Sequence, residues 1–146
     1  MKDSFETEKR LLGKMMSNSR DYYDNHSLIT ERIFLDPLNR KIYKAISSRL
    51  DKGSKPDILD ITTSIKDPLC DVRLAECMAS DHYAYLTKNM VLFLLEQDKK
   101  ESLKRLVEHT NKKINNNDDL FDIIQFLEDQ IKSNVTQRIL YRCCYI

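Results

Sequence analysis

Few residues of this 146-residue chain have the types and spacings that an active site requires. The candidates for proton transfer are acids that lie three positions apart or beside a histidine: Asp21 with Asp24, Asp57 with Asp60, and Asp81 with His82. Structural roles explain them as well, because Asp57 and Asp81 precede expected helices, where a carboxylate caps the backbone. No Ser or Cys has a His at a spacing typical of nucleophilic catalysis. The sequence therefore predicts no catalytic residues.

The cysteines and histidines do not have the spacing of a metal site. Cys70 and Cys77 are separated by six intervening residues, and Cys143 and Cys144 are adjacent, so neither pair matches a common zinc pattern. The three histidines are scattered along the chain. The N-terminus is polar and does not resemble a secretory signal. We therefore expect a cytoplasmic protein with reduced thiols and no bound metal.

Glycine is too rare for a nucleotide-binding loop. Gly13 and Gly53 lie 40 positions apart, so the chain contains neither a GxxxxGK[ST] phosphate loop nor a GxGxxG turn. The scarcity of glycine and proline also argues against a sheet-rich fold, which needs frequent tight turns. No apolar run reaches the roughly 18–20 residues of a membrane span. These features predict a helical domain with no cofactor and no membrane contact.

Charge is balanced over the whole chain but not along it. The formal net charge is +1, which argues against extensive binding to phosphates. Lys99–Lys113 holds six basic and two acidic residues, a net of +4, whereas Asp118–Asp129 holds five acids and no base. Two helices of complementary charge lying side by side explain this pattern. A surface that binds another protein is the alternative.

Capping signals and apolar spacing place the helices that position these residues. Asp36-Pro37 and Asp67-Pro68 each predict a helix start, and Gly53 predicts a helix end. Polar residues 18–25 are expected to form a loop. A long segment over 82–114 precedes a short turn at 115–117. The next helix is predicted from an apolar stripe of Leu120, Ile123, Ile124, Leu127 and Ile131.

The predicted fold is all-α. Residues 1–80 form a compact helical head, and residues 81–133 form a long antiparallel helical hairpin, because so short a turn brings the second helix back beside the first. Residues 134–146 form a tail that extends the hairpin or begins a linker.

Four short motifs resemble the N-terminal domain of replicative DNA helicases of the DnaB family. Glu8-Lys9-Arg10-Leu11-Leu12-Gly13 is similar to the family's opening E-x-x-[LV]-L-G signature. Phe34-x4-Asn39-Arg40-x-Ile42-Tyr43-x-Ala45-Ile46 resembles its F-x4-H-x2-I-[FY]-x-A-I helix, with Asn39 in place of the usual His. Leu50-x2-Gly53-x2-Pro56-Asp57-Ile58 is similar to a turn of the family, and the stretches at 83–86 and 119–122 match its hairpin in position.

The resemblance implies a non-catalytic collar domain. In the family these domains pair through their hairpins on the hexameric ring and dock the C-terminal domain of primase, and the resemblance also implies a helicase loader as a partner. DNA would be contacted only indirectly. ATP and magnesium belong to the family's motor domain, whose phosphate loop this sequence lacks. We therefore expect either one domain of a helicase or a stand-alone relative.

Two sets of hairpin residues are the candidates for these contacts. For self-association they are apolar: Leu92, Leu95, Leu103, Leu106, Leu127 and Ile131. For docking of a partner they are charged: Lys100, Lys104, Asp122 and Asp129. Packing within the hairpin explains the apolar set equally well. Two other functions stay open, namely a nucleic-acid-binding module that uses the Lys99–Lys113 face and the tyrosines, and a small accessory protein that mimics the helicase collar.

Overall fold

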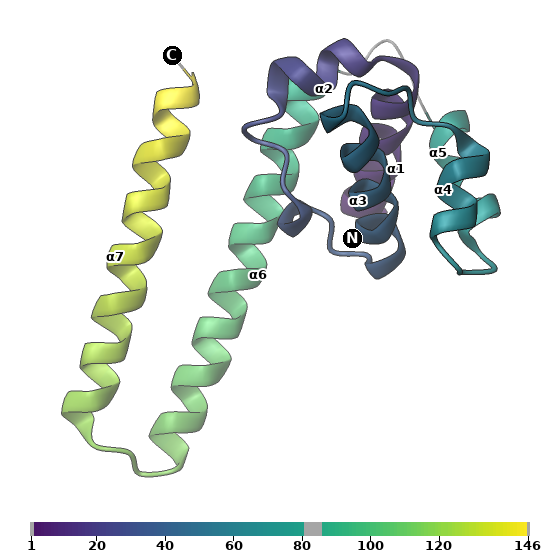
Figure 1. The fold of residues 1–146 in the computed structure, drawn as a ribbon. Coiled ribbons are helices and arrows are strands. Elements are labelled where there is room, and N and C mark those ends of the chain that lie inside the picture. Colours follow the sequence, from purple (N-terminus) through teal and green to yellow (C-terminus); the bar gives the residue numbers. More distant parts are fainter. Residues whose placement is uncertain (1, 81–85, 146) are drawn as a thin grey trace. The chain divides into compact units, whose positions relative to one another are not determined.

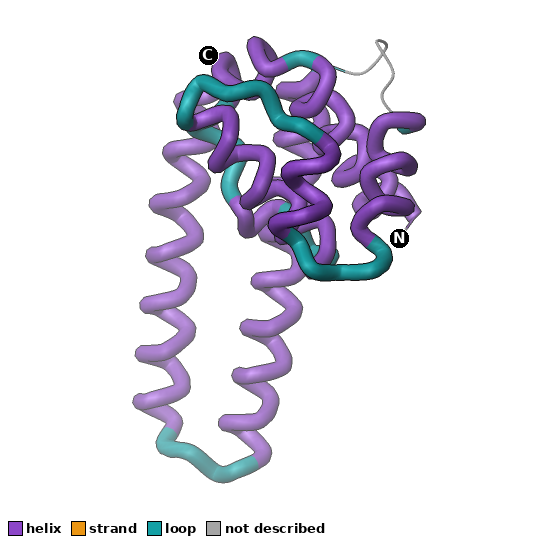
Figure 2. The backbone as a smooth tube through the Cα atoms, turned by 45° about the vertical axis from the view of Figure 1, so that its right-hand side comes forward, coloured by secondary structure: helices purple, strands orange, loops and turns teal. Residues whose placement is uncertain are grey.

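The computed structural model describes the backbone of residues 2–80 and 86–145 and the side chains of residues 4–80 and 86–133. Within these residues the regular elements are all helical, which confirms the predicted fold class (Figures 1 and 2). They are α1 (Lys2–Ser17), α2 (Ser19–Asn25), the 3-10 turn η1 (Glu31–Ile33), α3 (Pro37–Asp51), α4 (Ile58–Ser64), α5 (Cys70–Ala79), α6 (Thr87–Asn115) and α7 (Leu120–Tyr145). The predicted cap Asp81, the candidate His82 and the stretch 83–85 lie outside the described residues, as do the side chains of Cys143 and Cys144.

The chain divides into two compact units, Met1–Lys99 and Lys100–Ile146. The division falls after Lys99, within α6. The reason is that the first turns of α6 bury apolar side chains within the first unit: Met90, Val91, Leu94 and Leu95. Two polar contacts join the same part of α6 to the rest of the first unit. The Thr87 hydroxyl donates to Asp21 at 2.9 Å, and Arg32 lies 3.9 Å from Asp98.

The first unit, which we call the head, is built around α1. This helix packs against α2, α3 and α5. Its contribution to the core follows from its apolar spacing, because Leu11, Leu12 and Met15 recur at helical intervals and are fully buried. The opposing side chains come from the other helices and from the chain around η1: Ile33, Phe34, Ile42, Ile46, Ile61 and Leu74.

The predicted caps of α3 and α4 are confirmed. The Asp36 carboxylate accepts a hydrogen bond from the backbone N–H of Asn39 at 2.9 Å, and Asp57 does the same for Leu59 at 3.0 Å. Gly53 ends α3 with φ +74°, a left-handed conformation that glycine adopts without a steric penalty. These helix ends depend on neighbouring residues alone, so the sequence is enough to predict them.

Two local predictions were wrong. Residues 18–25 are not a loop, because Ser19–Asn25 forms α2. Its Tyr22 is buried and donates a hydrogen bond to Asp51 at 2.8 Å, so contacts with a distant helix stabilise a segment that is polar throughout. The helix expected directly after Asp67-Pro68 begins at Cys70, because Asp67 first closes a turn by accepting from the Leu69 N–H at 2.9 Å.

The second unit contains the end of α6 and all of α7. In it α7 runs back beside α6, as the predicted hairpin requires (Figures 1 and 2). Helix α7 continues to Tyr145, so the backbone of the tail extends the hairpin helix.

Candidate interaction surface on the hairpin

The turn of the hairpin is held by backbone hydrogen bonds and one carboxylate. Asn117 adopts φ 56°, a left-handed conformation that asparagine tolerates better than most residues. The N–H groups of Asn117 and Asp118 donate to carbonyls at the end of α6, at 3.2 and 3.1 Å. The Asp119 side chain then accepts from the Phe121 N–H at 3.0 Å and caps α7. This turn sets which sides of α6 and α7 face each other.

The inner sides of the two helices are only partly apolar. Ile123 is buried, and Leu106, Phe126 and Leu127 are half-buried. The Phe126 ring lies 5.1 Å from the His109 ring and 5.0 Å from the ammonium of Lys113, which also lies 4.0 Å from Asp118. Such a cation on an aromatic ring contributes about 0.5–1 kcal/mol at an exposed site. Among the side chains that the structure describes, the inner contact of the hairpin therefore consists of one aromatic contact and a few aliphatic side chains.

A second set of apolar side chains in the hairpin is exposed. These residues recur at helical spacing on both helices and keep between 44% and 67% of their surface accessible: Leu103, Val107 and Ile114 on α6, and Leu120, Ile124 and Ile131 on α7. Val107 follows the inner residue Leu106 by one position, and Ile124 follows the inner residue Ile123 by one position. In two antiparallel helices this equal offset, about 100° of rotation, turns both sets to the same side of the hairpin. We call these six residues the apolar face.

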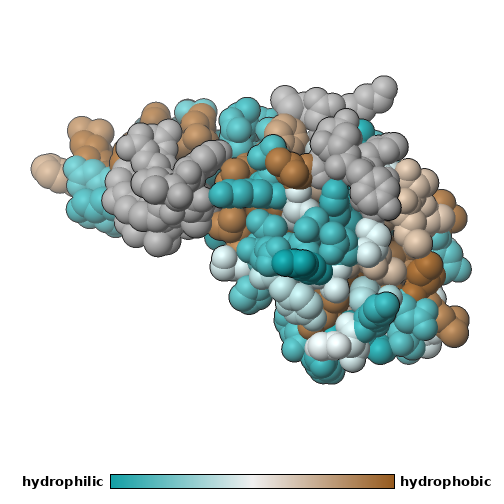
Figure 3. Space-filling view, turned by 90° about the horizontal axis from the view of Figure 1, so that it is seen from above, coloured by the Kyte–Doolittle hydropathy of each residue, from teal (hydrophilic) through white to brown (hydrophobic). Residues whose placement is uncertain are grey.

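Exposed apolar side chains also occur on the head, so regular spacing is what distinguishes the apolar face. Figure 3 shows hydrophobic residues reaching the surface at several separate places among hydrophilic ones. On the head they include Leu59, Leu69 and Val72. Scattered apolar residues of this kind are normal on protein surfaces. Exposed apolar residues at helical spacing on one side of two neighbouring helices are less usual, and they suit contact with another apolar surface.

The predicted apolar set is divided between three environments. Leu95 is 8% exposed within the head, where it packs in the core. Leu92, Leu106 and Leu127 are half-buried. Leu103 and Ile131 belong to the apolar face. Val107 is not among the apolar residues predicted from the sequence, and Ile114 is not among those predicted for self-association, although their spacing from Leu103 by four and eleven positions carries the signal.

The predicted charged set lies on the hairpin, and its members differ in their contacts. Lys104 lies 3.6 Å from Glu101, one turn away on the same helix. Asp129 accepts a hydrogen bond from Gln125 at 3.0 Å. Lys100 and Asp122 are exposed. All four side chains are accessible from solvent, so contacts within the hairpin leave them available to a partner.

Three of the carboxylates considered for catalysis have structural partners. Asp21 accepts from Thr87, Asp57 caps α4, and Asp60 lies 2.9 Å from Arg49. Among the residues that the structure describes, no three His, Cys, Asp or Glu side chains gather as they would around a metal ion. In that same part of the chain, no helix is both long and apolar enough to cross a membrane.

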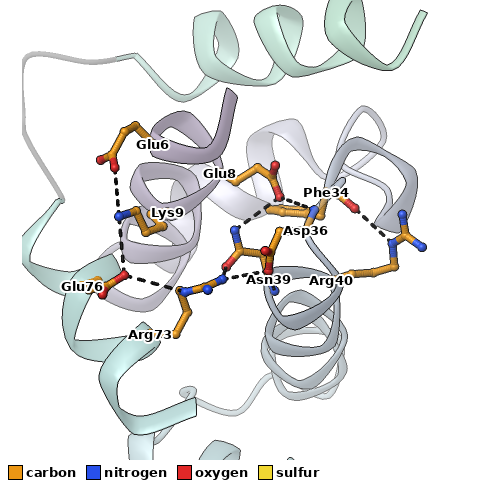
Figure 4. Close-up of polar contacts among 9 residues, drawn as sticks. All are labelled: Glu6, Glu8, Lys9, Phe34, Asp36, Asn39, Arg40, Arg73 and Glu76. Atoms are coloured by element: carbon orange, nitrogen blue, oxygen red, sulfur yellow. Dashed lines mark hydrogen bonds and ion pairs between the residues drawn. The ribbon is translucent and has the colours of Figure 1, made fainter. Parts of the chain in front are cut away.

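A polar network inside the head surrounds Glu8, as Figure 4 shows. Glu8 is 2% exposed and accepts hydrogen bonds from the Asn39 side chain and the Asp36 N–H, both at 3.3 Å. Arg73 donates to Asn39 and to Asp36 at 2.8 Å each, and it lies 3.7 Å from Glu76. The network thus joins α1 to the start of α3 and to α5.

The environment shifts the pKa values of Glu8 and Asp36 in opposite directions. Burial raises the pKa of Glu8 to about 7, although the hydrogen bonds from Asn39 and Asp36 oppose the shift. Burial also acts to raise the pKa of Asp36, but the Asn39 N–H and the Arg73 guanidinium outweigh it and hold this pKa below its usual value. Glu8 is therefore an internal carboxyl that titrates near neutral pH, whereas Asp36 is the charged partner of Arg73.

The head matches a family of known domains. Residues 1–89 match the model of the DnaB-like helicase N terminal domain, which is more than half of the chain. The chain belongs to this family. No curated protein and no solved structure shows significant similarity to it. The match ends three residues into α6, so most of the hairpin lies outside it.

The first two motifs that resemble this DnaB-like domain contribute to the core of the head. Glu8 and Asn39, from two different motifs, bond to each other, so an amide side chain occupies the position of the family's usual His and still meets the glutamate. Tyr43 stacks on Phe34 at 4.8 Å and donates to the carbonyl of Ile29 at 2.9 Å. These residues are accordingly structural, and they explain why the motifs have their spacing.

Proposed function

We propose that this DnaB-like N-terminal domain is a cytoplasmic, non-catalytic collar domain of a replicative helicase, and that it associates with copies of itself through the hairpin. The observation that supports this proposal is the apolar face. Two helices can cover only one side of each other, and the exposed residues lie on the side that α6 and α7 leave open. A second copy of the same face supplies an apolar surface of matching length. The domain needs no cofactor for this function.

Self-association is tested by adding charge to the apolar face. We expect the chain to be dimeric or larger in sedimentation velocity at tens of micromolar. The double variant Val107→Asp, Ile124→Asp should be monomeric, because two carboxylates would be buried without partners. Both residues are half exposed in the single chain, so the helix content by circular dichroism should stay the same.

The matched control alters charge away from the apolar face. Arg105→Gln with Lys112→Gln also lowers the net charge by two, and both residues are exposed on the opposite side of α6. This control should associate like the parent chain. A parent chain that stays monomeric at high micromolar concentration would contradict the proposal.

Docking of primase or a loader is the second part of the proposal. Charged residues at the rim of an apolar surface select the partner more than they add affinity. We propose that Lys100, Lys104, Asp122 and Asp129 have this role. Lys104→Glu with Asp122→Lys keeps the net charge and should weaken binding to the C-terminal domain of primase about tenfold at low salt. Calorimetry with that domain measures the effect, and unchanged affinity in a variant that still self-associates would remove these residues from the docking site.

A further inference from the structure

An open groove of about 560 Å³ lies on the head, between α3 and the end of α4. It is lined by Lys41, Lys44, Lys66, Ala45, Ser64 and Ile65. The three lysines are exposed, whereas Ile65 is buried and Ala45 is half-buried, so positive charges surround an apolar base. We call this feature the lysine groove.

Two of the three lysines contribute charge that the head does not neutralise. Lys44 lies 2.8 Å from Glu31, and its hydrogen bond holds the pKa of that carboxyl below the usual value. In the part of the chain that the structure describes, Lys41 and Lys66 form no ion pair. The Ser64 hydroxyl donates to the carbonyl of Ile61 at 2.9 Å. The ammonium groups therefore dominate recognition, and they favour an acidic ligand that also carries an apolar side chain.

The hairpin of the same protein carries a segment with this chemistry. Residues 118–122 read Asp-Asp-Leu-Phe-Asp and lie at the start of α7. Leu120 and Phe121 are 67% and 82% exposed, and Phe121 is thereby the most exposed large apolar residue of the described chain. All three carboxylates are at the surface, although Asp119 also caps α7 and Asp118 lies 4.0 Å from Lys113. Acidic residues thus flank two apolar residues on this tip, which is the combination that the lysine groove favours.

We propose that the lysine groove of one copy binds the 118–122 tip of a second copy. The carboxylates of Asp118 and Asp122 would lie against Lys41 and Lys66, and the side chain of Leu120 or Phe121 would cover Ile65 and Ala45. The groove and the tip are different surfaces, so the contact is heterologous. This contact uses no inner residue of the hairpin and only Leu120 of the apolar face. It can therefore be tested separately from hairpin pairing. Together the two contacts would extend an assembly beyond a dimer.

The first test is zero-length cross-linking of the full chain. A carbodiimide joins a lysine ammonium to a carboxylate that touches it, so it reports the proposed pairs directly. Unlabelled and ¹⁵N-labelled chains are mixed before the reaction and analysed by mass spectrometry. We expect Lys41 or Lys66 linked to Asp118 or Asp122, in peptides that combine one light and one heavy segment. Links found only between segments of the same isotope would overturn the proposal.

The second test is charge reversal with rescue. Lys41→Glu with Lys66→Glu should lower the proportion of species larger than the hairpin-paired dimer in sedimentation at least about fivefold at low salt. Asp118→Lys with Asp122→Lys should do the same. A mixture of the two variants should associate again, because the reversed charges match; for this mixture the readout is sedimentation. Failure of the mixture to associate would overturn the pairing.

The matched controls use lysines and acids outside the proposed contact. Lys52→Glu with Lys55→Glu changes the charge of the head equally at exposed positions away from the groove, and it should leave the links in place. The Val107→Asp, Ile124→Asp variant should lose hairpin pairing and keep the mixed-isotope links, which separates failure of this inference from failure of the proposed function.

Nucleic acid is the competing occupant of a lysine-lined groove. If Lys41→Glu with Lys66→Glu weakens binding of a single-stranded oligonucleotide and leaves the mass in sedimentation unchanged, the groove binds phosphates instead of the tip. That outcome would overturn the proposal.

Discussion

The head and the hairpin use apolar residues in opposite ways. In the head, α1 and α3 bury whole side chains such as Leu12 and Ile46, and a polar network around Glu8 is enclosed with them. In the hairpin, half of the surface of residues such as Leu103 and Ile131 stays exposed, and the inner contact depends on one aromatic ring. The head is thus stabilised by its own core, whereas the hairpin leaves a set of apolar side chains exposed.

The largest expected effect is on the core of the head. Leu12→Ala should lower the free energy of unfolding by about 3 kcal/mol, because Leu12 is fully buried and its removal leaves a cavity. Leu103→Ala in the hairpin should change it by less than about 0.5 kcal/mol in the monomer. Urea unfolding followed by circular dichroism, at a concentration below self-association, measures both. Equal losses would abolish the distinction between the two regions.

A pH titration tests whether the carboxyl of Glu8 is buried inside the head. Because the pKa of Glu8 is raised from 4.5 to about 7, the folded state binds a proton more tightly than the unfolded state does. The contribution of protonated Glu8 to the free energy of unfolding is therefore complete below pH 4.5 and is lost as the pH rises through 7. The change is about 3 kcal/mol.

The measurement compares the parent chain with Glu8→Gln, whose neutral amide cannot titrate. Between pH 4 and pH 9 the free energy of unfolding of the parent chain should fall by about 3 kcal/mol relative to that of the variant. Near-UV circular dichroism checks that the core of the variant is intact. Parallel pH profiles would show that Glu8 is not buried as the structure describes.

The two helix caps offer a smaller and more selective test. Asp36→Ala should cost about 2 kcal/mol, because it removes the cap of α3 and leaves the half-buried Arg73 without one partner. Asp57→Ala removes only an exposed cap and should cost about 0.5–1 kcal/mol. Thermal unfolding of both variants under one set of conditions ranks them. The reverse order would mean that the network around Arg73 adds no stability.

The smallest effect compares the two left-handed turn residues. Gly53→Ala should lower the stability of the head by about 1 kcal/mol, because φ +74° disfavours any side chain even where no atom lies close. Asn117→Gly at the hairpin turn should be neutral or stabilising by a few tenths of a kcal/mol. Urea titration resolves the sign of each change. A stabilising Gly53→Ala would contradict the described turn.

Local chemistry in the sequence determined the ends of the helices and the kind of fold. A carboxylate before an N–H group at Asp36, Asp57 and Asp119, and a glycine at 53, act within one turn of backbone, so no tertiary contact is needed to read them. The apolar spacing likewise indicated that the fold is helical, and the short turn at 115–117 indicated that its last two helices form a hairpin.

Which sides of the helices are buried depends on the tertiary structure. Helical spacing places Leu95 and Leu103 in one predicted stripe, yet the head buries the first and leaves the second exposed. Burial of Glu8 and Tyr22 also depends on tertiary packing. Both are polar residues, and each is buried where it bonds to a residue far along the chain, Asn39 for Glu8 and Asp51 for Tyr22. Periodicity shows which residues share a side of a helix, but what packs on that side depends on residues far along the chain.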